Sequence, residues 1–287
     1  MTSLVRRSRL IHLLIGKVIH GVLIAVVLVW TFFPLYWVIV TSFRPEWEVL
    51  MYPSLPYPLH PTLMNYVKLM VEDKFYIYIL NSLVVSLGAT IISLLIGSLA
   101  AYALVRIGVP RFVDSLFLTW VLVVRMLPPI VLAIPLFMVL RTLGLIDTRF
   151  GLMIAYQVYT LPYVVWILLG FFREIPREIE EAALIDGASR VRVWTSIILP
   201  LALPGLIATM ILSVILTWNE FLYALVFINS PEKYTVTVRV ATYIYEFKIE
   251  WGRLAASGLT SALPVLLLSL YVQKYMIRGL AFGRVLR

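Results

Sequence analysis

The residues that could do chemistry lie inside long apolar stretches, where a charged side chain is costly. Arg125 falls in the apolar run 112–140, about 18 Å from its start at a helical rise of about 1.5 Å per residue, and Glu220 falls in the run 206–228. Charges inside membrane segments usually face a bundle interior and are often functional. Arg125 and Glu220 could therefore line a common polar cavity. A buried ion pair that only fixes helix register is the alternative.

Aromatic and amide side chains accompany these two charges. Tyr156, Tyr159 and Tyr163 recur at i, i+3 and i+7, with Gln157 beside them. Aromatic faces can stack on sugar rings, and amides and carboxylates can bond to sugar hydroxyls. An aromatic belt at the outer membrane interface explains Tyr156 at least as well. The predicted substrate path comprises Arg125, Tyr156, Gln157, Tyr159, Trp218, Asn219, Glu220 and Tyr223.

A charged segment, residues 173–205, separates two of the apolar runs and predicts an amphipathic helix. Pro176 suits its first turn, and Gly187 is well placed to end it. Ser189 could cap a second short helix that Pro200 closes. A solvated connecting loop is the plainer alternative. One helical stripe holds Glu174, Glu178 and Glu181, and the next holds Ile175, Ile179 and Ala182.

The composition excludes a soluble domain with an ordinary core. Of the 287 residues 62% are hydrophobic and only 14% are charged, which indicates a polytopic membrane protein. The net charge of +9 fits a membrane surface better than nucleic acid, because the basic residues cluster at the ends of apolar runs. Without cysteine there is no disulfide or thiolate chemistry, and the three histidines lack metal-ligand spacing. The chain also lacks the motifs GxxxxGK[ST], GxSxG and HExxH, so neither ATP hydrolysis nor enzymatic catalysis is expected.

Six apolar runs predict six membrane helices in one domain, residues 1–287. In the second run the small residues Ala89, Ser93, Gly97 and Ala101 recur every four positions, which would let another helix approach closely. The proline-rich segment 53–61 must lie outside the hydrocarbon, because its backbone would go unpaired there. The predicted spans are about 18–43, 81–105, 112–140, 151–172, 206–228 and 254–276.

The distribution of basic residues predicts the orientation. An even number of spans places both termini on one side of the membrane. With the termini inside, 14 of the 24 Lys and Arg residues lie in cytoplasmic segments and nine in outer loops. We therefore expect cytoplasmic termini and a cytoplasmic segment 173–205.

The charged segment also carries a recognisable pattern, EAAxxxG followed by nine residues and IxLP. It resembles the signature loop of the membrane permease subunits of ATP-binding-cassette (ABC) importers, in particular the second permease of the maltose-type carbohydrate importers. Trp218 to Leu222, WNEFL, is similar to the WN(D/E)FL segment of that permease's fifth span. The matching positions are Glu181, Ala182, Ala183, Gly187, Ile197, Leu199 and Pro200.

This resemblance implies an all-α type I importer fold and a non-catalytic transport subunit in the cell membrane. The chain would form half of a sugar pore with a homologous permease, for a di- or oligosaccharide such as maltose or trehalose. Two ATPase subunits would carry ATP and Mg²⁺, this chain would bind no cofactor, and an extracytoplasmic sugar-binding protein would deliver substrate. The residues expected to couple to the ATPase are Glu181, Ala182, Ala183, Asp186 and Gly187.

An ion-coupled secondary transporter is the rival interpretation. It would use Arg125 and Glu220 as coupling residues. It leaves the EAAxxxG segment without a purpose.

Overall fold

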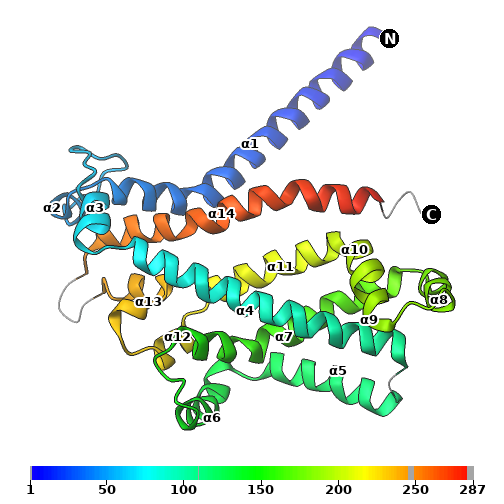
Figure 1. Cartoon of the computed structure of the whole chain (residues 1–287). Helices are drawn as coiled ribbons and strands as arrows, with labels where there is room; N and C mark the ends of the chain where they lie inside the picture. Colours follow the sequence, from blue (N-terminus) through cyan, green and yellow to red (C-terminus); the bar gives the residue numbers. More distant parts are fainter. Residues whose placement is uncertain (1, 109, 245–248, 283–287) are drawn as a thin grey trace. The chain divides into compact units, whose positions relative to one another are not determined.

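The computed structural model describes residues 2–108, 110–244 and 249–282 (Figure 1). The chain forms two compact units. Unit 1 consists of Met1–Asp73 with Tyr243–Leu259, and unit 2 of Lys74–Thr242 with Thr260–Arg287. All regular elements in the described part of the chain are helices, which confirms the predicted all-α class.

Four helices in the described chain are long and apolar enough to cross a membrane, and there are six such spans if each of two bent helix pairs forms one. The four straight candidates lie in α1 (Thr2–Ser42), α4 (Tyr76–Tyr102) with its π-helical end Ala103–Ile107, α7 (Arg149–Glu174) and α14 (Trp251–Phe282). The bent pairs are α5 (Arg111–Met126) with α6 (Pro129–Thr142), and Arg190–Leu201 with α11 (Leu203–Trp218).

The predicted third span, 112–140, is therefore not one helix. α5 and α6 meet at an angle of 104°. The backbone of Leu127 is extended because the residue before a proline avoids the helical region, and Pro128 has no N–H to continue the helix. The proline pair thus divides the apolar run into two helices, and the run does not continue as one kinked helix.

The predicted fifth span, 206–228, is also interrupted. α11 ends at Trp218, and a separate short helix, α12 (Leu222–Phe227), follows after three residues without helical structure. At the other end of α11 the bend of 79° falls at Ala202, between α10 (Leu199–Leu201) and α11. Pro200 therefore lies inside α10 and does not close the preceding helix as we predicted.

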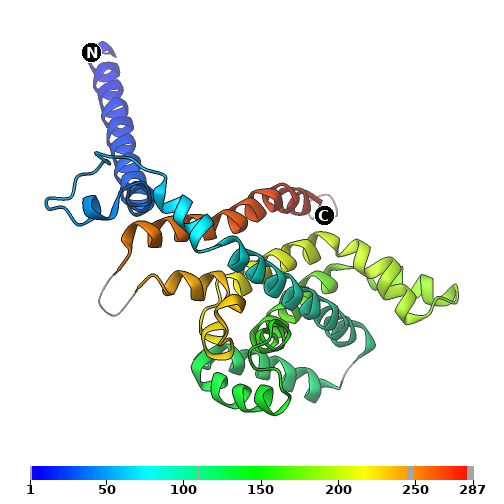
Figure 2. The same cartoon turned by 60° about the vertical axis from the view of Figure 1, so that its left-hand side comes forward.

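The core of unit 2 is built by α4, α7 and α11, which run side by side (Figures 1 and 2). The predicted small-residue stripe of α4 is buried. Gly97 lies so close to α7 that a Cβ placed there would be 2.7 Å from Val164 Cγ1. Ser93 Oγ lies 2.6 Å from Gln157 Oε1 and 2.8 Å from Thr160 Oγ1. Small and hydroxyl-bearing residues thus allow a close, hydrogen-bonded helix pair, as membrane helices require.

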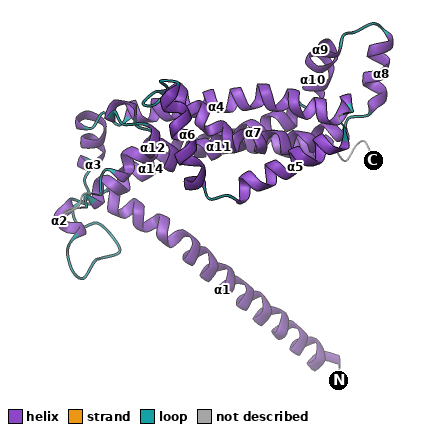
Figure 3. Cartoon of the chain, turned by 90° about the horizontal axis from the view of Figure 1, so that it is seen from below, coloured by secondary structure: helices purple, strands orange, loops and turns teal. Residues whose placement is uncertain are grey.

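The two ends of unit 2 carry different connections (Figure 3). At one end lie α8 (Arg177–Ile185) and α9 (Arg190–Val193), the latter continued by a π-helical turn, Trp194–Ile198. At the other end lie α6, α12, the 3-10 turn Pro231–Lys233 and α13 (Val236–Ala241). The connections predicted to be cytoplasmic gather at one end and those predicted to be external at the other, so the structure is consistent with the alternation of spans.

Asp147 ties the external connections of unit 2 together. Its carboxylate accepts hydrogen bonds from Asn229 N at 3.0 Å and Ser230 N at 2.9 Å, and pairs with Lys233 Nζ at 2.9 Å. The Ser230 hydroxyl also donates to it. Together these donors hold the pKa of Asp147 well below that of an ordinary aspartate.

Unit 1 contains α1, α2 (Glu46–Val49), α3 (Met64–Val67), a π-helical turn Lys68–Glu72 and the beginning of α14. Two buried charges fold its proline-rich loop. Arg44 donates to Tyr57 O at 2.9 Å, and Glu48 accepts from the backbone N–H groups of Leu59 and His60 at 2.6 and 2.9 Å. Burial raises the pKa of Glu48, but these two hydrogen bonds and the nearby Arg44 outweigh it and lower the pKa overall.

The first prediction concerns the contact between α4 and α7. Replacing Gly97 by Leu should prevent the two helices from packing, because the added side chain meets Val164. We expect a large fall in the yield and melting temperature of detergent-purified protein. Gly170→Leu on α7 is the matched control, since nothing lies within 4 Å of a Cβ at that position. Equal stability of the two variants would contradict the packing described above.

The second prediction concerns pH. Because the pKa of Asp147 is lowered in the folded protein, its contribution to stability is present above the ordinary aspartate pKa of about 3.9 and is lost as the pH falls below it. Asp147→Asn should therefore lower the melting temperature at pH 7, and the difference from wild type should narrow below about pH 4. Glu232→Gln, an exposed carboxylate in the same loop, serves as control. A constant difference at all pH values would show that the charge of Asp147 does not matter.

Candidate functional site

The charged segment between α7 and α11 folds as its local sequence predicts. α8 begins after Pro176, and Asp186 caps its carboxyl end. Gly187 adopts φ +85°, a left-handed conformation that favours glycine, and its N–H donates to Leu184 O. Ser189 Oγ accepts from Arg192 N at 3.3 Å and so caps α9.

The residues expected to couple to an ATPase mostly face solvent. Glu181, Ala182, Asp186 and Gly187 are exposed, and Ala183 is half-buried. Apolar side chains accompany them, because Ile179, Ile185 and Val191 are 42%, 86% and 68% exposed. We call α8 and α9, with these exposed apolar residues, the loop surface. An exposed surface of this kind marks an interaction site.

A buried carboxylate that the sequence analysis missed anchors the loop surface to the membrane helices. Glu180 accepts a hydrogen bond from the Tyr102 hydroxyl at 2.6 Å and lies 3.3 Å from Arg106 Nε. Arg106 also donates to the carbonyls of Phe172 and Ile175, at 3.0 and 2.5 Å. These bonds fasten α8 to the ends of both α4 and α7.

The predicted acidic stripe needs a correction for this reason. Glu174 is the last residue of α7 and does not belong to α8. Glu178 and Glu181 are exposed, whereas Glu180, on a different face of the helix, is buried. A charged residue between exposed glutamates has no distinguishing pattern, and its partners Tyr102 and Arg106 lie on another helix. The sequence offers one indication of this contact: Tyr102 and Arg106 are four residues apart at the end of a span and so lie on one helical face.

A cavity of about 780 Å³ in unit 2 is bordered by the break between α5 and α6, the break between α11 and α12, and α7. The non-helical residues Asn219–Phe221 and the proline break at 127–129 both border it. Irregular backbone at membrane depth is tolerated where it lines such a cavity. Of the predicted path and its neighbours, the lining includes Tyr159, Tyr163, Asn219, Glu220 and Tyr223.

Tyrosine rings in tilted contact form the aromatic side of this cavity. The rings of Tyr156 and Tyr159 are 5.6 Å apart between centroids, and those of Tyr159 and Tyr223 are 5.9 Å apart. Tyr156 is fully buried behind the lining, so it is not part of an aromatic belt in this structure. The Tyr156 hydroxyl lies next to the Glu220 carboxylate, and the buried hydroxyl of Tyr159 has no hydrogen-bond partner among the described residues. The cavity therefore has an aromatic face, lined by Tyr159, Tyr163 and Tyr223.

Glu220 is engaged by the short helix that follows it. Its carboxylate accepts hydrogen bonds from Tyr223 N at 2.8 Å and Ala224 N at 3.1 Å, which are amides of the first turn of α12. Its carbonyl accepts from the Thr237 hydroxyl at 2.7 Å. Asn219 is less constrained, because its amide nitrogen donates only to Ile215 O in its own helix. Asn219 is therefore the polar lining residue most available to a ligand.

Three residues of the predicted path, Tyr156, Gln157 and Trp218, do not line the cavity. Gln157 is committed to α4, where Nε2 donates to Ala89 O at 3.1 Å and Oε1 contacts Ser93, because it lies on the face of α7 next to that of Tyr156. Trp218 is buried, and its indole N–H donates to Ser261 O at 3.1 Å. The side chain of Arg125 lies outside the described residues, so its pairing with Glu220 stays a prediction. No cluster of three or more His, Asp or Glu residues that could hold a metal occurs in the described part of the chain.

Comparison with known proteins decides the family. Residues 93–280 match the family described as "Binding-protein-dependent transport system inner membrane component". The chain belongs to this family. The resemblance to ABC importer permeases is thereby confirmed, and the matched region includes both the loop surface and the cavity.

Similar proteins of this family cover almost the whole chain. The trehalose/maltose transport system permease protein MalG of Thermococcus litoralis is 36% identical, over 93% of this chain and 94% of MalG. The sulfoquinovosyl glycerol transport system permease protein SmoH of Agrobacterium fabrum is 33% identical, over 93% of both chains. A crystal structure of a bacterial ABC transporter that imports alginate shares the fold, with a TM-score of 0.77 and 22% identity over 91% of this chain and 96% of that one.

The third prediction tests the anchor. Glu180→Gln removes the charge opposite Arg106 and should loosen α8, because it strands a buried positive charge. We expect amide hydrogen exchange across Arg177–Ile185 to accelerate by about tenfold or more, with exchange in α11 unchanged. Glu178→Gln, an exposed neighbour on the same helix, is the control. If both variants exchange like wild type, Glu180 does not hold the loop surface.

Proposed function

We propose that this chain is the permease subunit of an ATP-driven importer and forms half of a translocation pore for a di- or oligosaccharide. The observation that carries the proposal is the cavity at the break between α11 and α12. It combines the rings of Tyr159 and Tyr223 with the Asn219 carboxamide and the Glu220 carboxylate. It lies in the same unit as the loop surface, which Glu180 anchors. This arrangement is expected of a transporter whose substrate cavity is driven by ATP hydrolysis in a partner subunit bound at the loop surface.

The lining of the cavity favours a sugar as substrate. Tyr159 and Tyr223 offer aromatic faces for sugar rings, and Asn219 offers hydrogen bonds to hydroxyls. A volume of about 780 Å³ is in the range of small-molecule sites and accommodates more than one sugar ring. Similar permeases are named for the transport of trehalose/maltose, sulfoquinovosyl glycerol and diacetylchitobiose, which supports the same class of substrate.

Energy would enter through the loop surface. Glu181, Ala182, Ala183, Asp186 and Gly187 would contact an ATPase subunit, which supplies ATP hydrolysis with Mg²⁺. The exposed side chains of Ile185 and Val191 supply apolar area for that contact. The bonds of Glu180 to Tyr102 and Arg106 would carry the movement into α4 and α7.

The remaining partners follow from the family. A second, homologous permease would complete the pore, two ATPase subunits would bind on the cytoplasmic side, and an extracytoplasmic binding protein would deliver the sugar. The charge distribution favours cytoplasmic termini in the cell membrane. An ion-coupled transporter receives less support, because Glu220 is engaged by two backbone amides and the loop surface would have no partner.

The fourth prediction is an uptake experiment. The complete complex in proteoliposomes should take up at least one of maltose, trehalose, diacetylchitobiose and sulfoquinovosyl glycerol only when ATP is enclosed. Asn219→Ala should raise the half-saturating concentration by about 5- to 150-fold, since the loss of a hydrogen bond in a desolvated site costs about 1–3 kcal/mol. Asn229→Ala, an exposed residue outside the cavity, is the control.

Two loop variants separate coupling from substrate binding in the same preparation. Glu181→Lys reverses a charge on the loop surface, and Gly187→Asp strains a left-handed turn. Both should abolish uptake and release the ATPase during purification. Normal uptake with full ATPase retention in both variants would remove the coupling role. Uptake driven by an ion gradient without ATP would favour the rival transporter.

A further inference from the structure

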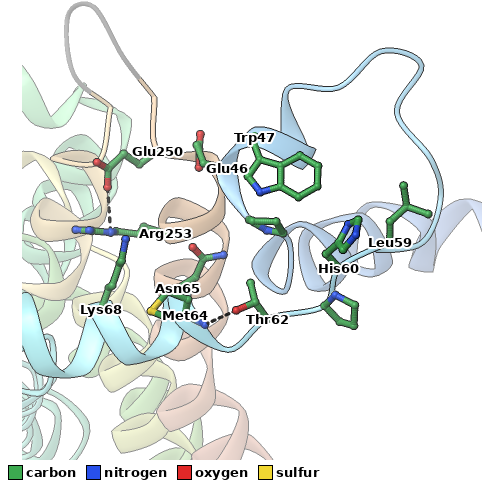
Figure 4. Close-up of a pocket in the computed structure, with 12 residues that line it drawn as sticks. Glu46, Trp47, Leu59, His60, Thr62, Met64, Asn65, Lys68, Glu250 and Arg253 are labelled. Atoms are coloured by element: carbon green, nitrogen blue, oxygen red, sulfur yellow. Dashed lines mark hydrogen bonds and ion pairs between the residues drawn. The ribbon is translucent and has the colours of Figure 1, made fainter.

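A second cavity, of about 820 Å³, lies in unit 1 and belongs to neither site described above (Figure 4). It lies between α2, the loop that ends at Thr62, the π-helical turn that begins at Lys68, and the start of α14. All of its lining residues are in unit 1. The buried pair of Arg44 and Glu48 holds the loop on one side, so the cavity is framed by fixed backbone.

One wall of this cavity is aromatic. Trp47 is 55% exposed, although it belongs to a folded segment, and its ring centroid is 5.1 Å from that of His60. Figure 4 shows both rings on the same side of the cavity, with Leu59 next to His60. An exposed indole beside a cavity offers a large apolar face on which a ligand can stack.

The lining also supplies hydrogen-bond donors and acceptors. The Lys68 ammonium group and the Trp47 indole N–H have no partner among the described residues. Thr62 Oγ1 accepts from Met64 N at 3.1 Å, and its own proton remains free to donate. Glu46 accepts two long bonds of 3.2 Å from Trp251 N and Gly252 N, which leaves acceptor capacity on both carboxylate oxygens.

Among the lining side chains, Glu46 and Glu250 offset Lys68 and Arg253. Arg253 is held by three carboxylates, those of Glu250 at 3.1 Å, Glu72 at 3.1 Å and Asp73 at 3.4 Å. A phosphate or other strong anion would meet the carboxylates of Glu46 and Glu250, and a cation would meet the Lys68 ammonium group. The lining therefore fits a neutral, hydroxyl-rich ligand with an apolar face. A hydroxyl-rich ring also uses both donors and acceptors, which a purely apolar ligand would leave unpaired.

We propose that this cavity is a second saccharide site, in which a sugar ring stacks on Trp47 and bonds to Lys68, Thr62 and Glu46. The proposal rests on the proposed function, since that function makes the ligand a sugar and places this segment on the outer face of the membrane. The site would hold a sugar outside the hydrocarbon, independently of the cavity lined by Asn219. The alternative occupant, a side chain of the binding protein, is decided by the same experiment.

The test is equilibrium binding of a fixed panel of neutral mono-, di- and oligosaccharides to the full complex in nanodiscs, without binding protein. Wild type should bind at least one member, and Trp47→Ala should weaken that binding by about tenfold or more. Trp47→Phe should retain part of it, because an aromatic face remains. Tyr52→Ala, which removes a 97% exposed aromatic residue of the same unit outside the cavity, should leave it unchanged. Asn219→Ala should weaken only binding in the cavity of unit 2, so the binding that is lost in Trp47→Ala should remain in this variant.

Every other outcome overturns the inference. If wild type binds no saccharide, or if only Asn219→Ala weakens binding, the sugar site is confined to unit 2. If Trp47→Ala keeps sugar affinity and loses retention of the binding protein, the cavity is a protein contact. Folding of Trp47→Ala is checked by the melting temperature of the complex. The proposed function fails separately, when wild type shows no ATP-dependent uptake of any sugar.

Discussion

The close contact between α4 and α7 is the constraint on which unit 2 depends. Polar interactions fasten this pair near one end and in its middle, and a third continues it to α8. Asn81 accepts from Arg149 Nε at 3.0 Å near one end, Ser93 contacts Gln157 in the middle, and Tyr102 extends the pair to Glu180 at the other end. In a bilayer such bonds have no competition from water within the hydrocarbon, and small residues such as Gly97 let the backbones come close enough to form them. The pair is therefore a stiff element between the loop surface and the external connections.

Against this stiff pair, the cavity is built from the parts of the unit that are broken. Both interruptions, at 127–129 and at 219–221, border the same 780 Å³ space, and each leaves backbone groups without a helical partner. A helix break in hydrocarbon is costly unless the freed groups are satisfied by protein or water. Placing two breaks around one cavity meets that condition and also supplies polar groups where a substrate needs them. The cavity therefore lies where the helices are interrupted, beside a helix pair that is continuous along its length.

The sequence predicted what depends on local chemistry. The position of α8 follows from Pro176 and Gly187, and the cap of α9 from Ser189, because each effect acts within one helical turn. The small-residue stripe of α4 was visible for the same reason. Glu180 could not be found, since its burial depends on partners about seventy residues away on another helix. Gln157 contacts α4 instead of the cavity, because it lies about 200° around the helix from Tyr159, which lines the cavity.

The break after Trp218 escaped prediction for a reason that bears on function. A hydropathy window averages over Asn219 and Glu220 and shows an unbroken span, but it does not register that Glu220 can cap a new helix. Its carboxylate meets the first free amides of α12, as Glu46 meets those of α14. Glu220 is thus required by the backbone as soon as the helix is broken, and its presence in the cavity follows from that requirement. The Asn219 side chain does not have this capping role, since its only hydrogen bond to the described residues is the one from its amide nitrogen to Ile215 O in its own helix. Variation in substrate among such permeases is therefore expected to act through Asn219 and the tyrosines, while the carboxylate at Glu220 stays fixed by the fold.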